Sequence, residues 1–347
     1  MTDTDSASAT ASPCAARGAS AGPLALASRP RRNRNNAVIR QFHSETWLGP
    51  QHFILPLFIH AGADRQPIAS MPGCDRLSLD AMEAEIAAAW AEGIGGFILF
   101  PKIDEHLKSV DGHQCHNPAG LVPQAIARIK RRFPQVQVLT DVALDPYSSD
   151  GHDGVVRDGR IVNDETVEIL CQQALCHARA GADLVAPSDM MDGRIGAIRK
   201  ALDAHGFTDV GILAYTAKYA SAFYGPFRDA LDSAPKFGDK KTYQMDPANR
   251  REALRELAAD QAEGADMVMV KPAGPYLDVI AAVRAHTTLP VAAYQVSGEY
   301  AMIKAACANG WLDERRVVLE SLLAIRRAGA DVILTYYARQ AARWLCE

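Results

Sequence analysis

Two lysines end consecutive apolar segments of this chain. Lys218 closes DVGILAYTAK (209–218), and Lys271 closes GADMVMVK (264–271), which continues directly into PAGPY. Burial and a neighbouring positive charge both lower a lysine pKa, and a neutral amine attacks a ketone to form a Schiff base. One lysine at a strand end is usually a solvated charge. Two on adjacent strands instead favour an enzyme that holds carbonyl substrates covalently.

The segments around these lysines belong to a repeated pattern. Four times, a glycine at a helix C-terminus precedes an apolar run, which is typical of a strand buried on both faces. These four runs are EGIGGFILF (92–100), AGADLVAPS (180–188), EGADMVMVK (263–271) and AGADVILTY (328–336). The other predicted strands are FILPLFIH (53–60), VQVLTDVAL (136–144), DVGILAYT (209–216) and PVAAYQVS (290–297). Helices are predicted near 78–91, 120–132, 164–179, 192–205, 247–262, 275–286, 299–309 and 313–327.

The alternation of strands and helices predicts the fold class. Eight repeats favour an α/β protein with a closed parallel (β/α)8 barrel, the TIM barrel. A doubly wound open sheet is the alternative, but AGADRQPIASMPG after the first strand lacks the glycine-rich turn that such sheets usually carry. In a barrel, both lysines lie at the active-site end. The long loops 145–163 and 217–246 are predicted to be lids or binding loops.

The composition is that of an ordinary globular protein. The chain has 347 residues, 48% apolar and 22% charged, and a formal net charge of −4, so it carries no electrostatic footprint for nucleic acid. Its seven cysteines are scattered without a CxxC pair, which argues against disulfides and for a reducing compartment. No apolar run approaches the ~20 residues that span a membrane.

The N-terminal residues fall into two parts. Residues 1–28 are rich in Ala and Ser and lack the hydrophobic block of a secretory signal, while Asp3 and Asp5 argue against a transit peptide. We therefore expect a cytoplasmic protein in which residues 1–28 are disordered. Residues 29–50 combine RPRRNR with apolar side chains that have no place in a barrel, and we predict an arm for subunit contacts. The catalytic barrel then spans 51–347.

These motifs together resemble the porphobilinogen synthase, or 5-aminolevulinate dehydratase, family. GADMVMVKPAGPY (264–276) is similar to that family's active-site signature, and the likeness runs from about Arg29 to the C-terminus through TDVALDPY, APSDMMDGRI, AYTAKYASAFYGPFRDA and YQVSGEYAMI. The resemblance implies a hydro-lyase of tetrapyrrole (heme) biosynthesis. Such an enzyme condenses two 5-aminolevulinate molecules to porphobilinogen, with loss of water, through lysine Schiff bases and without an organic cofactor.

The resemblance also implies which groups react. Lys271 would bind the molecule that supplies the propionate side chain, and Lys218 the molecule that supplies the acetate side chain and the aminomethyl group. Asp141, at the end of a predicted strand, is the candidate for moving protons. Ser188 is the candidate for orienting the region of the second substrate.

Two further groups of residues match those that hold the substrate carboxylates in the family. Ser297 and Tyr336, near the ends of the last two strands, would hold the first carboxylate. The second would be held by residues of the loop 217–246, namely Arg228, Lys240 and Gln244. Cations and an amide suit a carboxylate, and closure of the loop would exclude water from the imines.

The loop after Asp141 departs from the zinc-using branch of the family. Where that branch carries three cysteines, DVALDPYSSDGHDG (141–154) has Ala143, Asp145 and Asp153. Carboxylates suit Mg²⁺ or a monovalent ion and give zinc little preference, so Asp145 and Asp153 are metal candidates in an aspartate-rich, magnesium-responsive sequence. The alternative is that an Asp- and Gly-rich loop simply forms turns.

A second metal candidate is Glu256. The resemblance implies that it matches a glutamate of the magnesium-responsive family members, which anchors an allosteric Mg²⁺ through waters near a neighbouring subunit. The same resemblance implies a homo-octamer built from arm-exchanged dimers, in exchange with a smaller oligomer. No nucleic acid or membrane is expected among the partners.

Two competing functions fit parts of the sequence. A class I aldolase also uses a lysine Schiff base, but many of these bind phosphates on glycine-rich turns after strands seven and eight. Here these turns read SGEYAMI and YYARQAA and hold one glycine between them. A non-catalytic barrel would be expected to have lost a lysine or a loop cation, and all are present.

Overall fold

The computed structural model describes residues 25–347, which divide into two compact units between Glu45 and Thr46. The first unit contains a short 3-10 helix, η1 (Pro30–Arg34), and α1 (Ala37–Phe42). Most of the segment predicted to be disordered, 1–28, lies outside the described residues. The predicted arm, 29–50, spans the division between the units, and its role stays a prediction.

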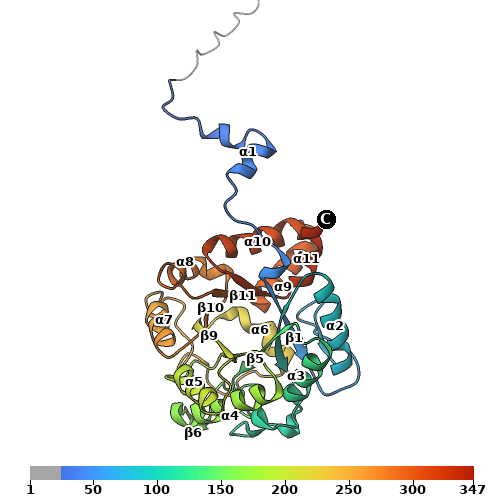
Figure 1. Cartoon of the computed structure of the whole chain (residues 1–347), viewed down its shortest axis with the longest axis vertical. Helices are drawn as coiled ribbons and strands as arrows, with labels where there is room; N and C mark the ends of the chain where they lie inside the picture. Colours follow the sequence, from blue (N-terminus) through green and yellow to red (C-terminus); the bar gives the residue numbers. More distant parts are fainter. Residues whose placement is uncertain (1–24) are drawn as a thin grey trace, which may run out of the picture. The chain divides into compact units, whose positions relative to one another are not determined.

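The second unit is a closed barrel of eight parallel strands within residues 46–347 (Figure 1). The barrel closes because the last strand pairs with the first, with Phe53 opposite Ile333 and Ile54 opposite Leu334. This confirms the predicted (β/α)8 fold. In order around the barrel, the strands are β1 (Phe53–Ile59), β4 (Gly96–Pro101), β5 (Gln137–Val142), β8 (Leu184–Pro187), β9 (Gly211–Lys218), β10 (Met267–Lys271), β11 (Val291–Gln295) and β12 (Val332–Thr335).

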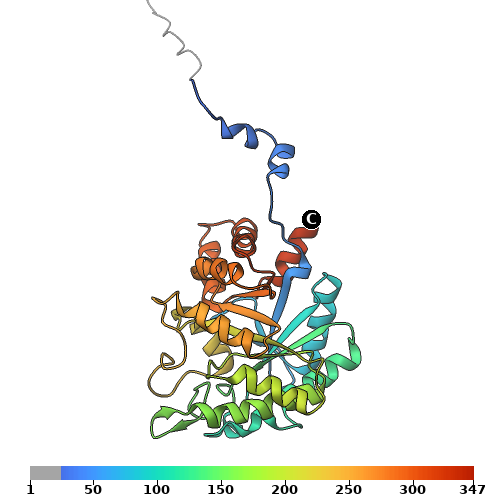
Figure 2. The same ribbon diagram turned by 60° about the vertical axis from the view of Figure 1, so that its left-hand side comes forward.

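Helices surround these strands (Figure 2). Those near the predicted positions are α2 (Leu79–Ala91), α3 (Leu121–Arg132), α4 (Asn163–Ala180), α5 (Arg194–Ala204), α7 (Glu252–Ala262), α8 (Leu277–Ala285), α9 (Ser297–Ala308) and α10 (Glu314–Ala328). Both α9 and α10 lie between β11 and β12. The eighth strand is followed by α11 (Ala338–Cys346), which was not predicted because its apolar face, Ala338, Ala341 and Ala342, is built from small residues.

The glycines that precede the strands have the predicted conformation. Gly181, Gly264 and Gly329 have φ of 104°, 97° and 120°, in the region where side chains are strained. Each ends a helix and lets the chain turn into the next strand. Within the described residues, no helix is both long and apolar enough to cross a membrane.

The two long loops carry additional elements. The loop after β5 contains a hairpin of β6 (Val156–Arg157) and β7 (Arg160–Ile161). The loop after β9, predicted to lack a helix, contains η5 (Ala222–Tyr224) and α6 (Gly225–Leu231). The Gly225-Pro226 pair resembles a helix breaker, but proline is favourable in the first turn of a helix, where its missing N–H is not needed. A second hairpin, β2 (Gln66–Pro67) and β3 (Asp75–Leu77), follows β1.

Candidate active site

The two lysines are direct neighbours in the barrel. β9 and β10 pair in parallel, and the register places Lys271 opposite Lys218, after an irregularity between Val268 and Val270. Each lysine is only 6% exposed. Two amine side chains therefore share one buried end of the barrel, where solvent screens their charges only weakly.

Lys271 points into a cage of aromatic rings. Within residues 25–347, its ammonium nitrogen makes no hydrogen bond or ion pair. Burial, and next the charge of Lys218, lower the pKa of Lys271 to about 7. A large fraction of this side chain is therefore the nucleophilic amine at neutral pH. The distances from Nζ to the ring centres are 4.7 Å for Tyr294, 5.1 Å for Tyr215, 5.1 Å for Phe227 and 5.2 Å for Tyr224.

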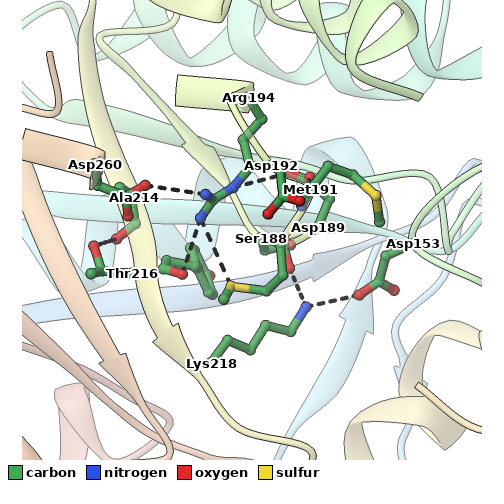
Figure 3. A network of polar contacts seen from close by, with 12 residues as sticks. Asp153, Ser188, Asp189, Met191, Asp192, Arg194, Ala214, Thr216, Lys218 and Asp260 are labelled. Carbon is green, nitrogen blue, oxygen red and sulfur yellow. Dashed lines mark hydrogen bonds and ion pairs between the residues drawn. The ribbon is translucent and has the colours of Figure 1, made fainter. Parts of the chain in front are cut away.

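Lys218 has polar surroundings instead. Its ammonium group lies 3.0 Å from Oδ2 of Asp153 and donates a hydrogen bond to the backbone carbonyl of Ser188, as Figure 3 shows. Burial alone would raise the pKa of Asp153, but Lys218 and Lys240 hold that pKa well below its usual range. Asp153 is therefore an anion that forms an ion pair with Lys218.

Asp153 also binds the loop after β9. Its Oδ1 lies 2.6 Å from Nζ of Lys240, and its Oδ2 accepts a hydrogen bond of 3.5 Å from Nε2 of Gln244. Asp145 lies 3.6 Å from the same Lys240 nitrogen. The structure thus brings together the two loop aspartates and two of the residues predicted to bind the second carboxylate.

Asp141 lies beside both lysines at the end of β5. Burial, and then the charge of Asp145, raise the pKa of Asp141 to about 7, while Lys218 and Lys271 act in the opposite direction. Its Oδ1 is buried and has no hydrogen-bond partner within the described chain. Asp141 can therefore both donate and accept a proton near neutral pH.

A cavity of about 30 Å³ lies between these side chains. This volume holds little more than a water molecule, so two substrate molecules require the loops to move. Arg228 of α6 lines the cavity, and its guanidinium makes no hydrogen bond or ion pair with another residue of 25–347. The cavity is lined by Phe100, Asp141, Asp145, Asp153, Ser188, Lys218, Tyr224, Phe227, Arg228, Lys240, Gln244 and Lys271.

Ser297 and Tyr336 lie behind the aromatic cage and not on the cavity wall. Oγ of Ser297 accepts a hydrogen bond of 3.0 Å from the backbone N–H of Phe227, and the hydroxyl of Tyr336 lies 2.8 Å from that of Tyr294. Ser297 therefore contacts the backbone of one cage residue, and Tyr336 contacts the hydroxyl of another. In this closed arrangement they support the cage.

Comparison with known proteins identifies the family. Residues 27–344 match the family model described as delta-aminolevulinic acid dehydratase. The chloroplastic delta-aminolevulinic acid dehydratase of Physcomitrium patens is 63% identical over 326 residues, which cover 93% of this chain and 76% of that protein. The chain belongs to the delta-aminolevulinic acid dehydratase family. The enzyme is therefore a hydro-lyase with porphobilinogen synthase activity in tetrapyrrole biosynthesis, as its sequence predicted.

Two further relatives agree with this assignment. Delta-aminolevulinic acid dehydratase 1, chloroplastic, of Arabidopsis thaliana is 59% identical over 326 residues, which cover 93% of this chain and 76% of that protein. A crystal structure of the Toxoplasma gondii ME49 enzyme in complex with the reaction product porphobilinogen is 58% identical, with a TM-score of 0.92 over 92% of both chains.

The comparisons contradict one prediction, the cytoplasmic location. The plant relatives at 59–63% identity are named as chloroplastic proteins. The argument from Asp3 and Asp5 was wrong because it concerned a segment that precedes the matched residues, which begin at 27. Two acidic residues there are too weak a signal to decide a compartment.

The two predicted metal positions of the enzyme differ in chemistry. Asp145 and Asp153 already face ammonium groups, so a cation there would have to displace Lys218 or Lys240. Glu256 of α7 instead lines a separate hollow of about 800 Å³ together with Asp192 and Glu252. Within residues 25–347, no group of three or more His, Cys, Asp or Glu side chains is arranged to hold a metal ion directly.

The carboxylate of Glu256 nevertheless fits a hydrated cation. Burial raises the pKa of Glu256. The charge of Arg194 lowers this pKa, and the charges of Asp260, Glu252 and Asp192 raise it. Its side chain makes no hydrogen bond or ion pair in the described part of the chain. A divalent ion bound through waters would relieve the repulsion between these carboxylates.

Sequence reasoning missed a buried ion pair under the site (Figure 3). Nη1 of Arg194 lies 3.1 Å from Oδ1 of Asp260, and its Nη2 donates a 3.3 Å hydrogen bond to the carbonyl of Tyr215 on β9. Asp189, next to Ser188, lies 3.9 Å from Nε of Arg194. The charged run SDMMDGR (188–194) directly after a buried strand was the available signal.

The aromatic cage was also missed. Tyr215 lies three residues before Lys218 on β9, and Tyr294 lies on β11 beside β10. A tyrosine in a buried strand usually reads as core, and only the barrel register shows that these rings meet at Lys271.

Proposed function

We propose that Lys271 forms the first Schiff base and Lys218 the second. The observation that carries this assignment is the register pairing of two buried lysines with different surroundings. Lys271 has a pKa near 7 and no polar partner, whereas Lys218 is held by Asp153. Lys271, whose amine is partly neutral near pH 7, reacts first, and Lys218 becomes available when substrate rearranges the loops.

The chemistry at each lysine is the same. The amine adds to the ketone carbon of 5-aminolevulinate, and the resulting carbinolamine loses its hydroxyl as water to give the imine. The leaving hydroxyl needs a proton, which Asp141 supplies because burial raises its pKa to about 7. Asp141 is then the base that accepts a proton in a later step. Ser188, whose hydroxyl interacts with Asp141, orients this region.

Two sets of residues are proposed to hold the substrate carboxylates. Ser297 and Tyr336 bind the first one after the aromatic cage opens. Arg228, Lys240 and Gln244 bind the second one. Lys240 and Gln244 now hold the Asp153 carboxylate, which has the same chemistry as the ligand. Charge-assisted hydrogen bonds to these groups would fix the substrate, and the closed loop would keep water away from the imines.

We also propose that Mg²⁺ binds through waters at Glu256, and that it acts on assembly and not on the chemistry. The acidic hollow and the unpaired carboxylate support this position. Zinc and organic cofactors are not proposed, because the described residues that line the cavity around the lysines include no cysteine, and the lysine amines themselves activate the ketone. The assembly proposed is a homo-octamer formed through residues 29–50.

The lysine assignment is tested by trapping. The enzyme is mixed with 5-aminolevulinate at pH 7, reduced with borohydride and digested, and the modified lysine is found by mass spectrometry. We expect the adduct on Lys271 at low substrate, and on Lys218 as well at high substrate. Lys271→Met should abolish the first adduct. Lys200→Met, an exposed lysine of α5, is the matched control and should leave both adducts unchanged.

A further inference from the structure

A contact outside the reacting groups joins the loops after β5 and β9. His152, only 2% exposed, lies 3.1 Å through Nδ1 from the hydroxyl of Tyr243 and 3.1 Å through Nε2 from the backbone carbonyl of Phe237. A carbonyl oxygen can only accept, so Nε2 carries the hydrogen in the neutral ring. Nδ1 therefore accepts its hydrogen bond from Tyr243.

The same tyrosine hydroxyl also contacts Asp153, the residue that binds Lys218 and Lys240. The backbone N–H of Asp153 donates a hydrogen bond of 3.3 Å to the Tyr243 oxygen. The Tyr243 hydroxyl thus donates to His152 and accepts from Asp153, and both contacts are satisfied at once. This arrangement fixes the backbone of Asp153, whose carboxylate lies between Lys218 and Lys240.

These residues form a thin wall between two spaces. His152, Phe237 and Tyr243 line the outer hollow of about 800 Å³. The next residues along the chain, Asp153 and Gln244, line the inner cavity of about 30 Å³. Separation of the two loops at this wall would join the spaces and enlarge the inner cavity, which is too small for substrate as it stands.

We propose that His152 and Tyr243 form a latch that holds the loop after β9 closed and positions Asp153 for the reaction. The latch acts through Asp153 and Lys240 and does not touch substrate. His152 and Tyr243 are therefore positioning residues. The proposal rests on the proposed function in that Asp153, Lys218 and Lys240 belong to the reaction site. A buried histidine that only fills space would not need both ring nitrogens paired across two loops.

The latch is tested by hydrogen exchange on the full-length enzyme, followed by mass spectrometry. Tyr243→Phe removes the hydroxyl and keeps the ring. We expect amide exchange in 150–155 and 232–246 to rise about fivefold or more, as the loss of one or two hydrogen bonds predicts. Exchange in the barrel strands should stay unchanged. Tyr219→Phe is the control, because among residues 25–347 its hydroxyl bonds only the carbonyl of Asn249.

Substitutions of His152 provide the second arm. His152→Gln keeps one acceptor and one donor, whereas His152→Leu keeps neither. We expect the first to restore most of the loop protection and the second to lose it. The apparent KM for 5-aminolevulinate should rise about tenfold in His152→Leu and Tyr243→Phe, with a smaller change in kcat, because an open loop weakens binding more than it alters the reacting amine.

The outcomes separate the latch from the lysine assignment. Unchanged loop exchange in Tyr243→Phe, or equal exchange in His152→Gln and His152→Leu, would overturn the latch. A uniform loss of protection across the whole barrel would also overturn it, since that shows a general structural role. Failure to trap substrate on Lys271 in the wild-type enzyme would instead contradict the proposed function and leave the exchange results as they stand.

Discussion

Lys218 and Lys271 are register partners on adjacent strands, yet their ammonium groups have opposite surroundings. Lys218 lies 3.0 Å from the Asp153 carboxylate, and Lys271 faces four aromatic rings without a polar partner in the described chain. One site thus holds an amine that is paired with a carboxylate and an amine whose pKa is lowered to about 7. We propose that this asymmetry sets the order of substrate binding in an enzyme that joins two identical molecules.

The first prediction concerns Lys271. Lys271→Met removes the nucleophile and keeps the apolar stem, so we expect the rate of porphobilinogen formation to fall by about 1,000-fold or more. The colour reaction of porphobilinogen measures this rate. Activity within about tenfold of wild type, a barrier change of only ~1.4 kcal/mol, would refute the assignment.

The second prediction is a bell-shaped pH dependence centred near pH 7. As pH rises through about 7, Lys271 loses its proton and becomes reactive, so the rate rises. Over the same range Asp141 loses the proton needed by the leaving hydroxyl, so the rate falls at higher pH. The pH profile of kcat/KM measures both limbs.

Asp141→Asn tests the two limbs separately. We expect the rate to fall by about 100-fold or more, as for the loss of a general acid. The acid limb of trapping at Lys271 should move to lower pH, because the charge of Asp141 raises the pKa of Lys271. An acid limb that moves to higher pH would contradict this electrostatic account.

The third prediction concerns metals. Removal of Mg²⁺ should lower activity and its return should restore it, whereas a chelator selective for zinc should have no effect. Glu256→Gln should shift the Mg²⁺ activation curve to higher concentration and leave basal activity near wild type. A stoichiometric need for zinc, or an unshifted Mg²⁺ curve in Glu256→Gln, would show that this position is wrong.

The fourth prediction concerns the ion pair of Arg194. Asp260→Asn leaves the guanidinium buried without its 3.1 Å partner, so we expect the free energy of unfolding to fall by about 3 kcal/mol. Asp203→Asn breaks the exposed pair with Arg199 and should cost under about 0.5 kcal/mol. Denaturant titrations at one protein concentration compare them, and equal costs would argue against a structural role for the buried pair.

The fifth prediction concerns residues 29–50. Val38, Phe42 and Trp47 are 56%, 78% and 62% exposed in the single chain. Their burial against a neighbour would contribute several kcal/mol at roughly 25 cal/mol per Å². Deletion of 1–28 should leave the assembly unchanged, while deletion of 1–48 should give small, poorly active species. Light scattering that finds an unaltered octamer after the longer deletion would contradict the arm's role.

The sequence by itself determined the barrel and the place of both lysines. Repeated apolar runs after glycine helix caps are compatible with few folds. A lysine that ends such a run must lie at the carboxyl end of a strand. Two helices were not predicted. α11 was missed because alanines give a weak apolar signal, and α6 because Gly225-Pro226 resembles a helix breaker.

Only the tertiary structure decided which side chains meet. The aromatic cage of Lys271 draws on β9, β11 and the loop after β9. The contact of Asp153 with Lys218 and Lys240 joins residues up to 87 positions apart. The same is true of the pKa values, because burial and neighbouring charges set them and neither can be read from local sequence. Sequence patterns fix local periodicity, but distances across the barrel depend on register and closure.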